Sequence, residues 1–254
     1  MPEGRAGSAG GGAAGEAPDR RAELATRLAR VRTRIAEACA AAGRDRAAVT
    51  LVAVTKTYPA SDVLHLATLG VRDIGENRDQ EAAPKAAAVS AAGAQVRWHF
   101  VGQLQRNKAR SVAGYASLVH SVDSVRLARA LSKAAGAGTT SLEVLVQVSI
   151  DGDPDRGGAI PGGDAETGLA HVAEAVAKEK ALSLRGVMAV APLDWAPERA
   201  FERLASLAAE LRVTYPTADL ISAGMSADLE QAVAFGATHV RIGSALLGNR
   251  PALG

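Results

Sequence analysis

The sequence predicts a single (β/α)8 barrel of the TIM type, an α/β fold, preceded by an N-terminal helix. Short runs rich in Val, Ile and Leu recur eight times between residues 49 and 244, separated by alanine-rich segments of helical period. The runs are almost continuously apolar, which is typical of parallel strands that helices cover. Eight such units fit a closed barrel. The rival is an open doubly wound sheet, which usually carries a glycine-rich turn after its first strand, where this chain reads TKTYPAS.

The first 19 residues, MPEGRAGSAGGGAAGEAPD, are rich in glycine and alanine and lack the apolar segment of a signal peptide. This composition predicts a disordered leader. We therefore expect two parts, a leader at 1–19 and the barrel at 20–254.

A helix is expected directly after the leader, because apolar residues recur there at spacings of three and four. This apolar stripe consists of Leu24, Leu28, Val31, Ile35 and Cys39. Asp19 is a suitable N-cap for the helix and Gly43 a suitable end. Cys39 belongs to the stripe, so we interpret it as a core residue rather than a nucleophile.

Eight strands follow along the chain. They are expected at VTLVAVT (from Val49), VRDIG (Val71), VRWHFVG (Val96), SLVHSV (Ser117), LEVLVQVSI (Leu142), LRGVMAVA (Leu184), DLISAG (Asp219) and THVRIGS (Thr238). The clearest helical segments between them are APERAFERLASLAAELRVTY from Ala196 and SADLEQAVAFG from Ser226.

Charge and composition exclude several classes of protein. The 254 residues carry 29 Lys and Arg against 27 Asp and Glu, a net charge of +2 that does not argue for nucleic acid. Six arginines between Arg20 and Arg34 could contact RNA or lipid, but we favour a solvated helix face. No apolar run is long enough to span a membrane. The single cysteine suits a reducing compartment, so we expect a cytoplasmic protein.

In TIM-type barrels the chemistry is carried where strands end. The residues expected at those ends are Lys56, Glu76, Asn77, Gly102, Asp123, Asp151, Pro192, the segment Gly224–Ser226 and the segment Arg241–Ser244. Lys56 shares its strand face with Val52 and Val54, so on an inward face its amine points into the barrel mouth. Desolvation and a nearby cation lower the pKa of a lysine and so raise the fraction of its amine that is neutral. The neutral amine is the form that attacks carbonyls. The alternative is a lysine that only snorkels there and pairs with Glu76.

Two loops near the C-terminus resemble each other. ISAGMSADLEQAV places Gly224, Met225 and Ser226 between a strand and a helix, and VRIGSALLG does the same with Gly243 and Ser244. Each combines a glycine, a hydroxyl and the free N–H groups of a helix start, which is a suitable anion site. Loops after strands seven and eight often hold a phosphate in this fold. A phosphate site facing a carbonyl-seeking amine predicts pyridoxal 5′-phosphate (PLP) as the cofactor.

Arg241 completes this arrangement. A permanently charged guanidinium inside a barrel needs an acceptor. With PLP bound, Arg241 is expected to face the pyridine nitrogen and to keep it unprotonated, which weakens the ring as an electron sink. The alternative is that Arg241 pairs with a buried Asp or Glu.

A family resemblance rests on many motifs in the same order, namely VAVTKTYPA, IGENRDQE, WHFVGQLQRNKAR, SVDSVRLA, GVMAVAP, GMSADLEQAV and VRIGSALLG. Together they resemble the YggS-type PLP homeostasis proteins, relatives of the barrel domain of alanine racemase, from about residue 22 to residue 249. The resemblance implies that Lys56 carries the cofactor imine and that Arg241 faces the ring nitrogen. The further residues it implies around PLP are Asn77, His99, Met225, Ser226, Gly243 and Ser244.

One segment departs from that family pattern. Many relatives carry a lysine after the fifth strand, where this chain reads IDGDPDRGG with Arg156 at the comparable point. A secondary role of that lysine, such as accepting cofactor in transit, therefore has no lysine to carry it in this segment.

The resemblance implies a protein that binds PLP as a lysine Schiff base, buffers it or delivers it to apo-enzymes, and has little catalytic turnover. The alternative is a PLP-dependent racemase or decarboxylase on the same barrel. A racemase needs a second acid–base group and a C-terminal β-domain, whereas this chain ends soon after the eighth unit, and we interpret Tyr58 as a solvent-exposed loop residue. A Schiff-base aldolase does not explain Arg241. We expect a monomer, no metal, and neither nucleic acid nor membrane as partner.

Overall fold

The computed structural model describes residues 19–136, 141–153 and 156–248, and it confirms the barrel. Eight parallel strands close into one sheet in chain order, with β1 pairing β8 as well as β2. The strands are β1 (Thr50–Val54), β2 (Asp73–Glu76), β3 (Arg97–Phe100), β4 (Leu118–Val122), β5 (Leu142–Gln147), β6 (Leu182–Met188), β7 (Leu220–Ser222) and β8 (His239–Ile242). Each of them lies within or overlaps one of the eight runs that the sequence predicts.

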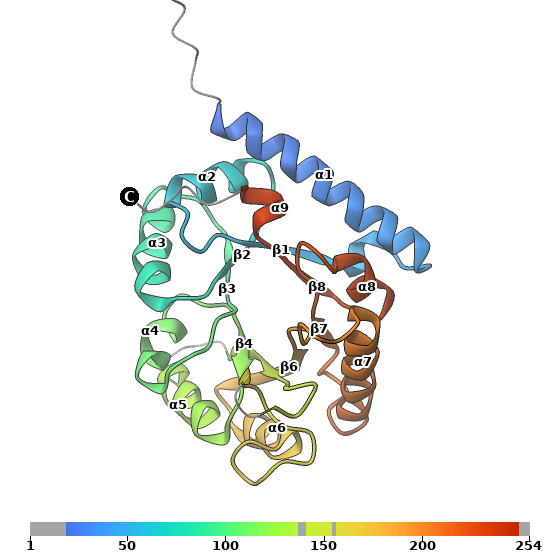
Figure 1. Cartoon of the computed structure of the whole chain (residues 1–254). Coiled ribbons are helices and arrows are strands. Elements are labelled where there is room, and N and C mark those ends of the chain that lie inside the picture. Colours follow the sequence, from blue (N-terminus) through green and yellow to red (C-terminus); the bar gives the residue numbers. More distant parts are fainter. Residues whose placement is uncertain (1–18, 137–140, 154–155, 249–254) are drawn as a thin grey trace, which may run out of the picture.

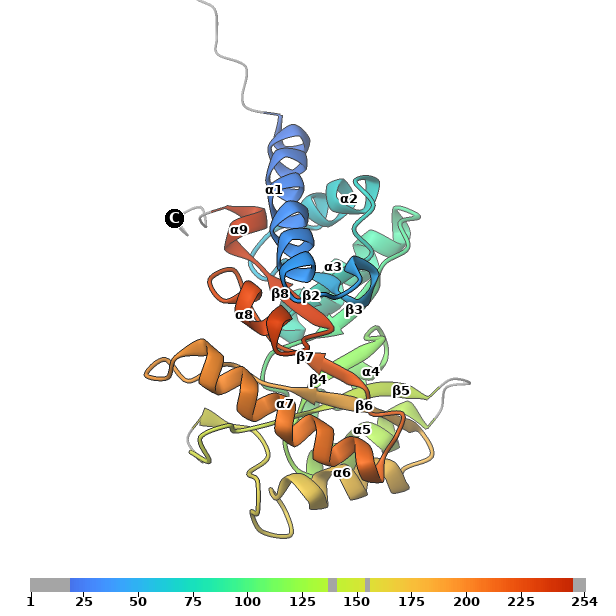
Figure 2. The same ribbon diagram turned by 90° about the vertical axis from the view of Figure 1, so that its right-hand side faces the viewer.

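Helices surround this barrel on the outside, as Figure 1 shows along its axis and Figure 2 from the side. They are α1 (Arg20–Ala41), α2 (Ala60–Thr68), α3 (Asp79–Ala91), α4 (Ala109–Ala113), α5 (Val125–Ala135), α6 (Leu169–Lys178), α7 (Pro197–Thr214), α8 (Leu229–Ala234) and α9 (Ser244–Leu247). Two 3-10 turns, η1 (Arg46–Ala48) and η2 (Arg106–Lys108), precede β1 and α4. None of the described helices is long and apolar enough to cross a membrane.

Helix α1 precedes the barrel and lies across its outer side, next to α2, α8 and α9 (Figure 1). Asp19 caps it, because its side chain accepts a hydrogen bond from the backbone N–H of Arg21. The whole predicted stripe is buried, and Cys39 is 1% exposed, so it is a core residue. Residues 1–18 of the predicted leader lie outside the described residues.

Two of the arginines of α1 form ion pairs with other helices. Arg34 binds Glu230 of α8, with 2.7 Å between its Nε and the carboxylate. Arg20 binds the buried Asp62 of α2 at 2.6 Å. Part of the basic run therefore attaches α1 to the barrel, and the run is not a uniform basic surface.

The barrel has two apolar regions. The larger one fills the space between strands and helices, and a smaller cluster of Leu118, Leu145 and Met188, with Leu220 packed against it, lies inside the strands. At the amino ends of the strands, an ion-pair ladder joins β2, β3, β5 and β6. Its contacts are Arg97–Asp73 (3.8 Å), Arg97–Glu143 (3.0 Å), Arg185–Glu143 (3.6 Å) and Arg185–Asp219 (3.6 Å). Apolar packing and charge pairs therefore close this end of the barrel.

Three histidines also lie inside the barrel, His99 on β3, His120 on β4 and His239 on β8. All are buried, and their ring centroids are 5.2 to 6.2 Å apart. Desolvation, with the neighbouring His99, lowers the pKa of His120 well below its ordinary value. The same causes lower the pKa of His239 from 6.5 to about 4. Both rings are therefore neutral in the folded protein at neutral pH.

We expect the free energy of unfolding to decrease as the pH falls from 6.5 towards 4. Over this range the unfolded chain binds protons at His120 and His239 that the folded barrel excludes. Each such proton contributes a slope of about 1.4 kcal/mol per pH unit. Urea unfolding of the wild type and of His239→Gln, at a series of pH values, measures the two slopes. The slope of the variant should be smaller than that of the wild type by about the contribution of one proton.

The buried Glu76 acts in the opposite direction, because desolvation raises the pKa of its carboxyl. It is present in both proteins, so its contribution cancels when the slopes are subtracted. Identical slopes in the wild type and His239→Gln would contradict a neutral, proton-excluding His239.

Candidate functional site

A cavity of about 640 Å³ opens at the carboxyl ends of the strands. Its described lining comes from the ends of β1, β2, β3, β6, β7 and β8. It comprises Val54, Lys56, Tyr58, Asn77, Val101, Gly102, Val190, Met225, Ser226, Ala227, Arg241, Gly243, Ser244 and Gly248. Seven of the eight predicted cofactor residues are therefore brought together around one space, and His99 is the exception.

Lys56 lies two residues beyond β1 and is half-buried at the cavity wall. The residues on either side of it are held in place. Thr55 donates from Oγ1 to Glu76 Oε1 at 2.6 Å, and its carbonyl accepts from Lys85 Nζ at 2.8 Å. Thr57 has a left-handed φ of 70°, and its N–H donates to Glu81 Oε2 at 3.0 Å. The backbone that carries Lys56 is therefore fixed, and its side chain belongs to the lining of the cavity.

The alternative that Lys56 pairs with Glu76 is wrong. Glu76 is fully buried and forms its ion pair with Lys85 of α3 instead. Within the described part of the chain, no salt bridge joins Lys56 to a carboxylate. Glu76 thus supports the Lys56 loop through Thr55 and leaves the Lys56 amine available. The sequence contained one signal for Lys85, a cation on a helix face that also carries the apolar residues Ala82, Ala86 and Val89.

The two predicted anion loops meet at the rim of the cavity. Ser244 Oγ lies 3.4 Å from Ser226 Oγ, and the N–H of Ala245 donates to Ser226 Oγ at 3.3 Å. Met225 is 40% exposed and lies beside them, with its N–H bound to Asp228 Oδ1 at 2.6 Å. The N–H groups of Leu246 and Leu247 in α9 already donate to the carbonyl of Gly243, so the two serine hydroxyls are the side-chain groups that an anion can contact at this rim.

The glycines of the two loops serve different purposes. Gly224 has a φ of 86°, and a Cβ there would lie 2.5 Å from the Cβ of Ala232, so the fold itself requires glycine. At Gly243 a Cβ would approach nothing closer than 3.7 Å, the carbonyl of Val54. The protein's own packing therefore leaves space at Gly243, and the cavity can receive a ligand close to this backbone.

Arg241 is 5% exposed and reaches the cavity from β8. Its Nη1 donates to Ser222 O at 2.8 Å and to Ser222 Oγ at 2.7 Å, and its Nη2 donates to Ala189 O at 2.9 Å. Burial lowers the pKa of the guanidinium to about 10, and Asp228 opposes this shift. Arg241 is therefore a cation at neutral pH.

The alternative that Arg241 pairs with a buried carboxylate is wrong for the described residues, where its hydrogen-bond acceptors are two carbonyls and one hydroxyl. Ser222 was not among the residues predicted for this site. The only signal for it was a hydroxyl within the apolar run DLISAG.

Asn77 follows β2 and lies against Gly102 at the cavity wall. A Cβ on Gly102 would lie 2.2 Å from the carbonyl oxygen of Asn77, so glycine is needed for this close approach. Asn77 Oδ1 is buried and has no hydrogen-bond partner in the described structure. An unpaired buried amide oxygen at a cavity fits a site that a polar ligand completes.

His99 does not line the cavity. It lies deeper in the barrel, fully buried, where its Nε2 contacts Asp73 Oδ1 and its Nδ1 contacts His120 Nε2, both at 2.9 Å. The structure therefore places no direct ligand contact at His99.

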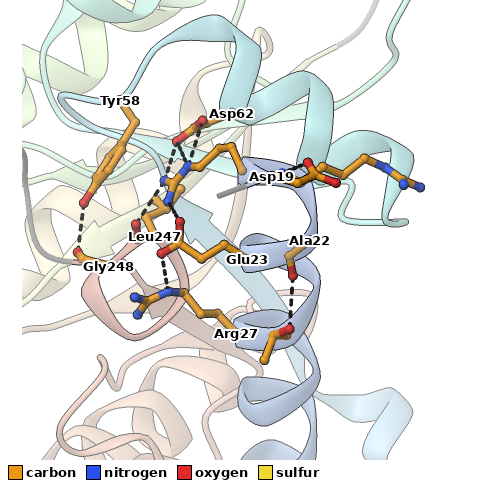
Figure 3. Close-up of polar contacts among 11 residues, drawn as sticks. Asp19, Ala22, Glu23, Arg27, Tyr58, Asp62, Leu247 and Gly248 are labelled. Carbon is orange, nitrogen blue, oxygen red and sulfur yellow. Dashed lines mark hydrogen bonds and ion pairs between the residues drawn. The ribbon is translucent and has the colours of Figure 1, made fainter. Parts of the chain in front are cut away.

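The interpretation of Tyr58 as a solvent-exposed loop residue is wrong. Its side chain is buried at 9% exposure, and its hydroxyl donates to the carbonyl of Gly248 at 2.8 Å (Figure 3). The Arg20 guanidinium carbon lies 5.7 Å from the centroid of its ring. Arg20 also binds Asp62 and donates to the carbonyl of Leu247 at 3.0 Å (Figure 3). Helix α1 thus connects the segment after Lys56 with the end of α9.

Arg156 lies beside the main cavity and not in it. It lines a smaller cavity of about 250 Å³ next to β5, and its Nε is 3.3 Å from Asp151 Oδ2. Val190 borders both cavities.

The residues present fit a phosphorylated aldehyde. An amine without a carboxylate partner, two adjacent hydroxyls, a buried cation and an unpaired amide oxygen surround one space. Such an arrangement can hold an anion at one end and bind a carbonyl group covalently at the other.

Comparisons with known proteins agree with this geometry. Residues 27–251 match the family described as alanine racemase, N-terminal domain. The pyridoxal phosphate homeostasis protein of Mycobacterium tuberculosis (strain H37Rv) is 45% identical, over 92% of this chain and 95% of the relative. That of Escherichia coli (strain K12) is 38% identical, over 90% of this chain and 97% of the relative.

Solved structures of other proteins share the barrel fold with this chain. PipY of Synechococcus elongatus PCC7942, with PLP bound, is 33% identical and has a TM-score of 0.73. The alignment covers 89% of this chain and all of PipY. An alanine racemase of Clostridium difficile 630 shares the fold with a TM-score of 0.65 and 11% identity, and this chain covers 57% of it.

Proposed function

This chain belongs to the alanine racemase N-terminal domain family and, within it, to the pyridoxal phosphate homeostasis proteins, and we propose that it holds PLP on Lys56. PLP bound here supplies an aldehyde, which condenses with the Lys56 amine to a Schiff base and releases water. The reaction is reversible, so a reactive aldehyde can be stored and later released. The function is PLP homeostasis, by buffering or delivery.

Each end of the cavity has its own part in binding. The hydroxyls of Ser226 and Ser244 and the backbone at Gly243 hold the phosphate. Arg241 donates to the ring nitrogen and, since it keeps its proton, leaves that nitrogen unprotonated. Asn77 Oδ1 accepts a hydrogen bond from the ligand, and Met225 packs beside the phosphate loops. His99 acts indirectly, from inside the barrel.

The single observation that carries this proposal is that one cavity brings Lys56, Arg241 and the two serines together from β1, β7 and β8. A storage role fits the remaining lining. Apart from Lys56, the ionisable side chains in the described lining are Tyr58 and Arg241. The Tyr58 hydroxyl already donates to Gly248, and Arg241 does not exchange its proton at neutral pH. A second group for proton transfer, which a racemase needs, is therefore poorly provided.

We propose apo-enzymes that need PLP as the recipients and a cytoplasmic monomer as the working form. Neither nucleic acid nor a membrane is among the proposed partners. Size-exclusion chromatography with light scattering tests the monomer, and a mass of two chains would contradict it.

A transfer experiment tests the function. The protein is loaded with PLP, freed of excess ligand and mixed with an apo-aminotransferase, whose activity is then followed. We expect activation by the loaded protein and none by a sample first reduced with borohydride, which fixes the cofactor covalently. Racemisation of alanine by the loaded protein alone, at ordinary enzymatic rates of about 1 per second or more, would contradict the storage role.

A further inference from the structure

A continuous chain of hydrogen bonds crosses the barrel interior below Arg241. It runs from Arg241 Nη1 to Ser222 Oγ (2.7 Å), to His120 Nδ1 (2.8 Å), from His120 Nε2 to His99 Nδ1 (2.9 Å), and from His99 Nε2 to Asp73 Oδ1 (2.9 Å). Its members come from β8, β7, β4, β3 and β2. Arg241, Ser222, His120 and His99 are all buried, with at most 5% exposure. The chain connects the cavity with the opposite end of the barrel.

The Arg241 end fixes the direction of the first bonds. A guanidinium can only donate, so Ser222 Oγ accepts from Arg241. The Ser222 hydroxyl proton then has one acceptor in the described structure, His120 Nδ1. Burial keeps His120 neutral, so its proton is on Nε2 and is directed at His99.

The Asp73 end of the hydrogen-bond chain requires the same direction of donation, from Arg241 towards Asp73. A carboxylate can only accept, and His99 and Arg97 beside it hold the pKa of Asp73 below its ordinary value, although burial opposes them. His99 therefore donates from Nε2 to Asp73, and its Nδ1 accepts from His120. The two ends demand the same tautomer at both histidines, and every donor meets one acceptor.

The reverse direction does not satisfy all groups. If His120 carried its proton on Nδ1, Ser222 Oγ would face two donors, and its own proton would have no acceptor in the described structure. An unsatisfied buried hydroxyl is unfavourable.

We propose that Ser222, His120, His99 and Asp73 position Arg241 through this one-directional chain, and so determine how the protein binds the ring nitrogen of its ligand. The inference rests on the proposed function. Ser222 Oγ and the carbonyl of Ala189 hold the two ends of the guanidinium, and the histidines keep the Ser222 hydroxyl turned away from it. These four are positioning residues, because none of them lines the cavity.

The hydrogen-bond chain keeps the positive charge of Arg241 apart from the negative charge of Asp73, which explains its length. A carboxylate in contact with Arg241 would neutralise the cation and compete for its donors. Here the acceptors that touch Arg241 are neutral, and the terminal carboxylate Asp73 is separated from it by Ser222, His120 and His99. The charge of Arg241 therefore remains available to the cavity while its geometry is fixed.

The test compares two ligands, PLP and its 1-deaza analogue, in which C–H replaces the ring nitrogen. We expect the wild type to prefer PLP. His120→Phe removes both nitrogens of the imidazole ring. It should weaken the binding of PLP about tenfold, equivalent to about 1.4 kcal/mol, and change the binding of the analogue little. His120→Asn places an acceptor near the position of Nδ1 and should restore most of the preference. The affinity for each ligand is measured as a dissociation constant, by titration followed through the visible absorbance.

Equal weakening of both ligands in His120→Phe, or no weakening of either, would overturn the positioning role. Ser222→Ala is the second variant, should His120→Phe fail to fold. In the wild type, 15N chemical shifts of the histidines should place both protons on Nε2, and a proton on Nδ1 of His120 would also overturn it. Failure of the proposed function is distinguishable, because the wild type would then show no borohydride-fixed PLP on Lys56.

Discussion

Lys56→Ala is expected to abolish covalent attachment of PLP completely. The variant mixed with PLP should lack the visible absorbance of the Schiff base, and borohydride should leave no cofactor on the protein by mass spectrometry. The reason is geometric, since Lys56 is the lysine that lines the described cavity. Binding through the phosphate should persist at lower affinity, because Ser226, Ser244 and Arg241 remain.

Lys108→Ala is the matched control for that variant. Lys108 lies near the same end of the barrel, 34% exposed, with its Nζ 4.0 Å from Asp79 Oδ2. It should bind and retain PLP like the wild type. Cofactor fixed at another lysine in Lys56→Ala, with unchanged absorbance, would disprove Lys56 as the point of attachment. Loss of the Schiff base in both variants would point to damage of the barrel mouth rather than to a role of one amine.

Ser226→Asp is expected to weaken PLP binding about 100-fold, equivalent to about 2.7 kcal/mol. The new carboxylate would replace a hydroxyl that lies 3.4 Å from Ser244 Oγ, next to the site of the doubly charged phosphate. Two like charges about 4 Å apart repel each other by about 4 kcal/mol at the effective dielectric of a protein surface. Titration with PLP and with pyridoxal, which lacks the phosphate, separates this repulsion from general damage.

Pyridoxal should bind Ser226→Asp almost as well as it binds the wild type. Added salt should recover part of the loss for PLP, because ions screen exposed charges. Ser206→Asp, on the exposed side of α7, adds the same charge away from the cavity and should change neither ligand. If PLP and pyridoxal lose affinity equally in Ser226→Asp, the phosphate does not bind between these two loops.

The strands and the positions of the candidate residues could be predicted because both depend on local patterns. A parallel strand buried on both sides is a short apolar run, and the chain contains eight of them in order. Once the barrel is accepted, the ends of its strands are known, and Lys56, Asn77, Arg241 and the two serine loops follow. The cavity then contains them, since the carboxyl ends of all strands meet at one face.

The partners of buried polar groups could not be predicted in this way. Glu76 is 20 residues from Lys56 and nine from Lys85, and nothing local tells which lysine it binds. Tyr58 directly precedes Pro59 in a turn that suggests exposure, yet its hydroxyl contacts Gly248 at the other end of the chain. His99 was placed at the cavity by family resemblance, but its position on β3 brings it to the level of Asp73 and His120 instead.

The sequence by itself determined the eight-stranded barrel, the helix before it, and the amine, cation and hydroxyls placed where strands end. Periodicity and turn residues encode these features, and they act over a few residues. Only the tertiary structure decided that Arg241 rests on Ser222 and a histidine chain, that Glu76 binds Lys85, and that α1 attaches to the loop after Lys56. Such contacts depend on strand register and on distances across the barrel, which are set only when the sheet has closed.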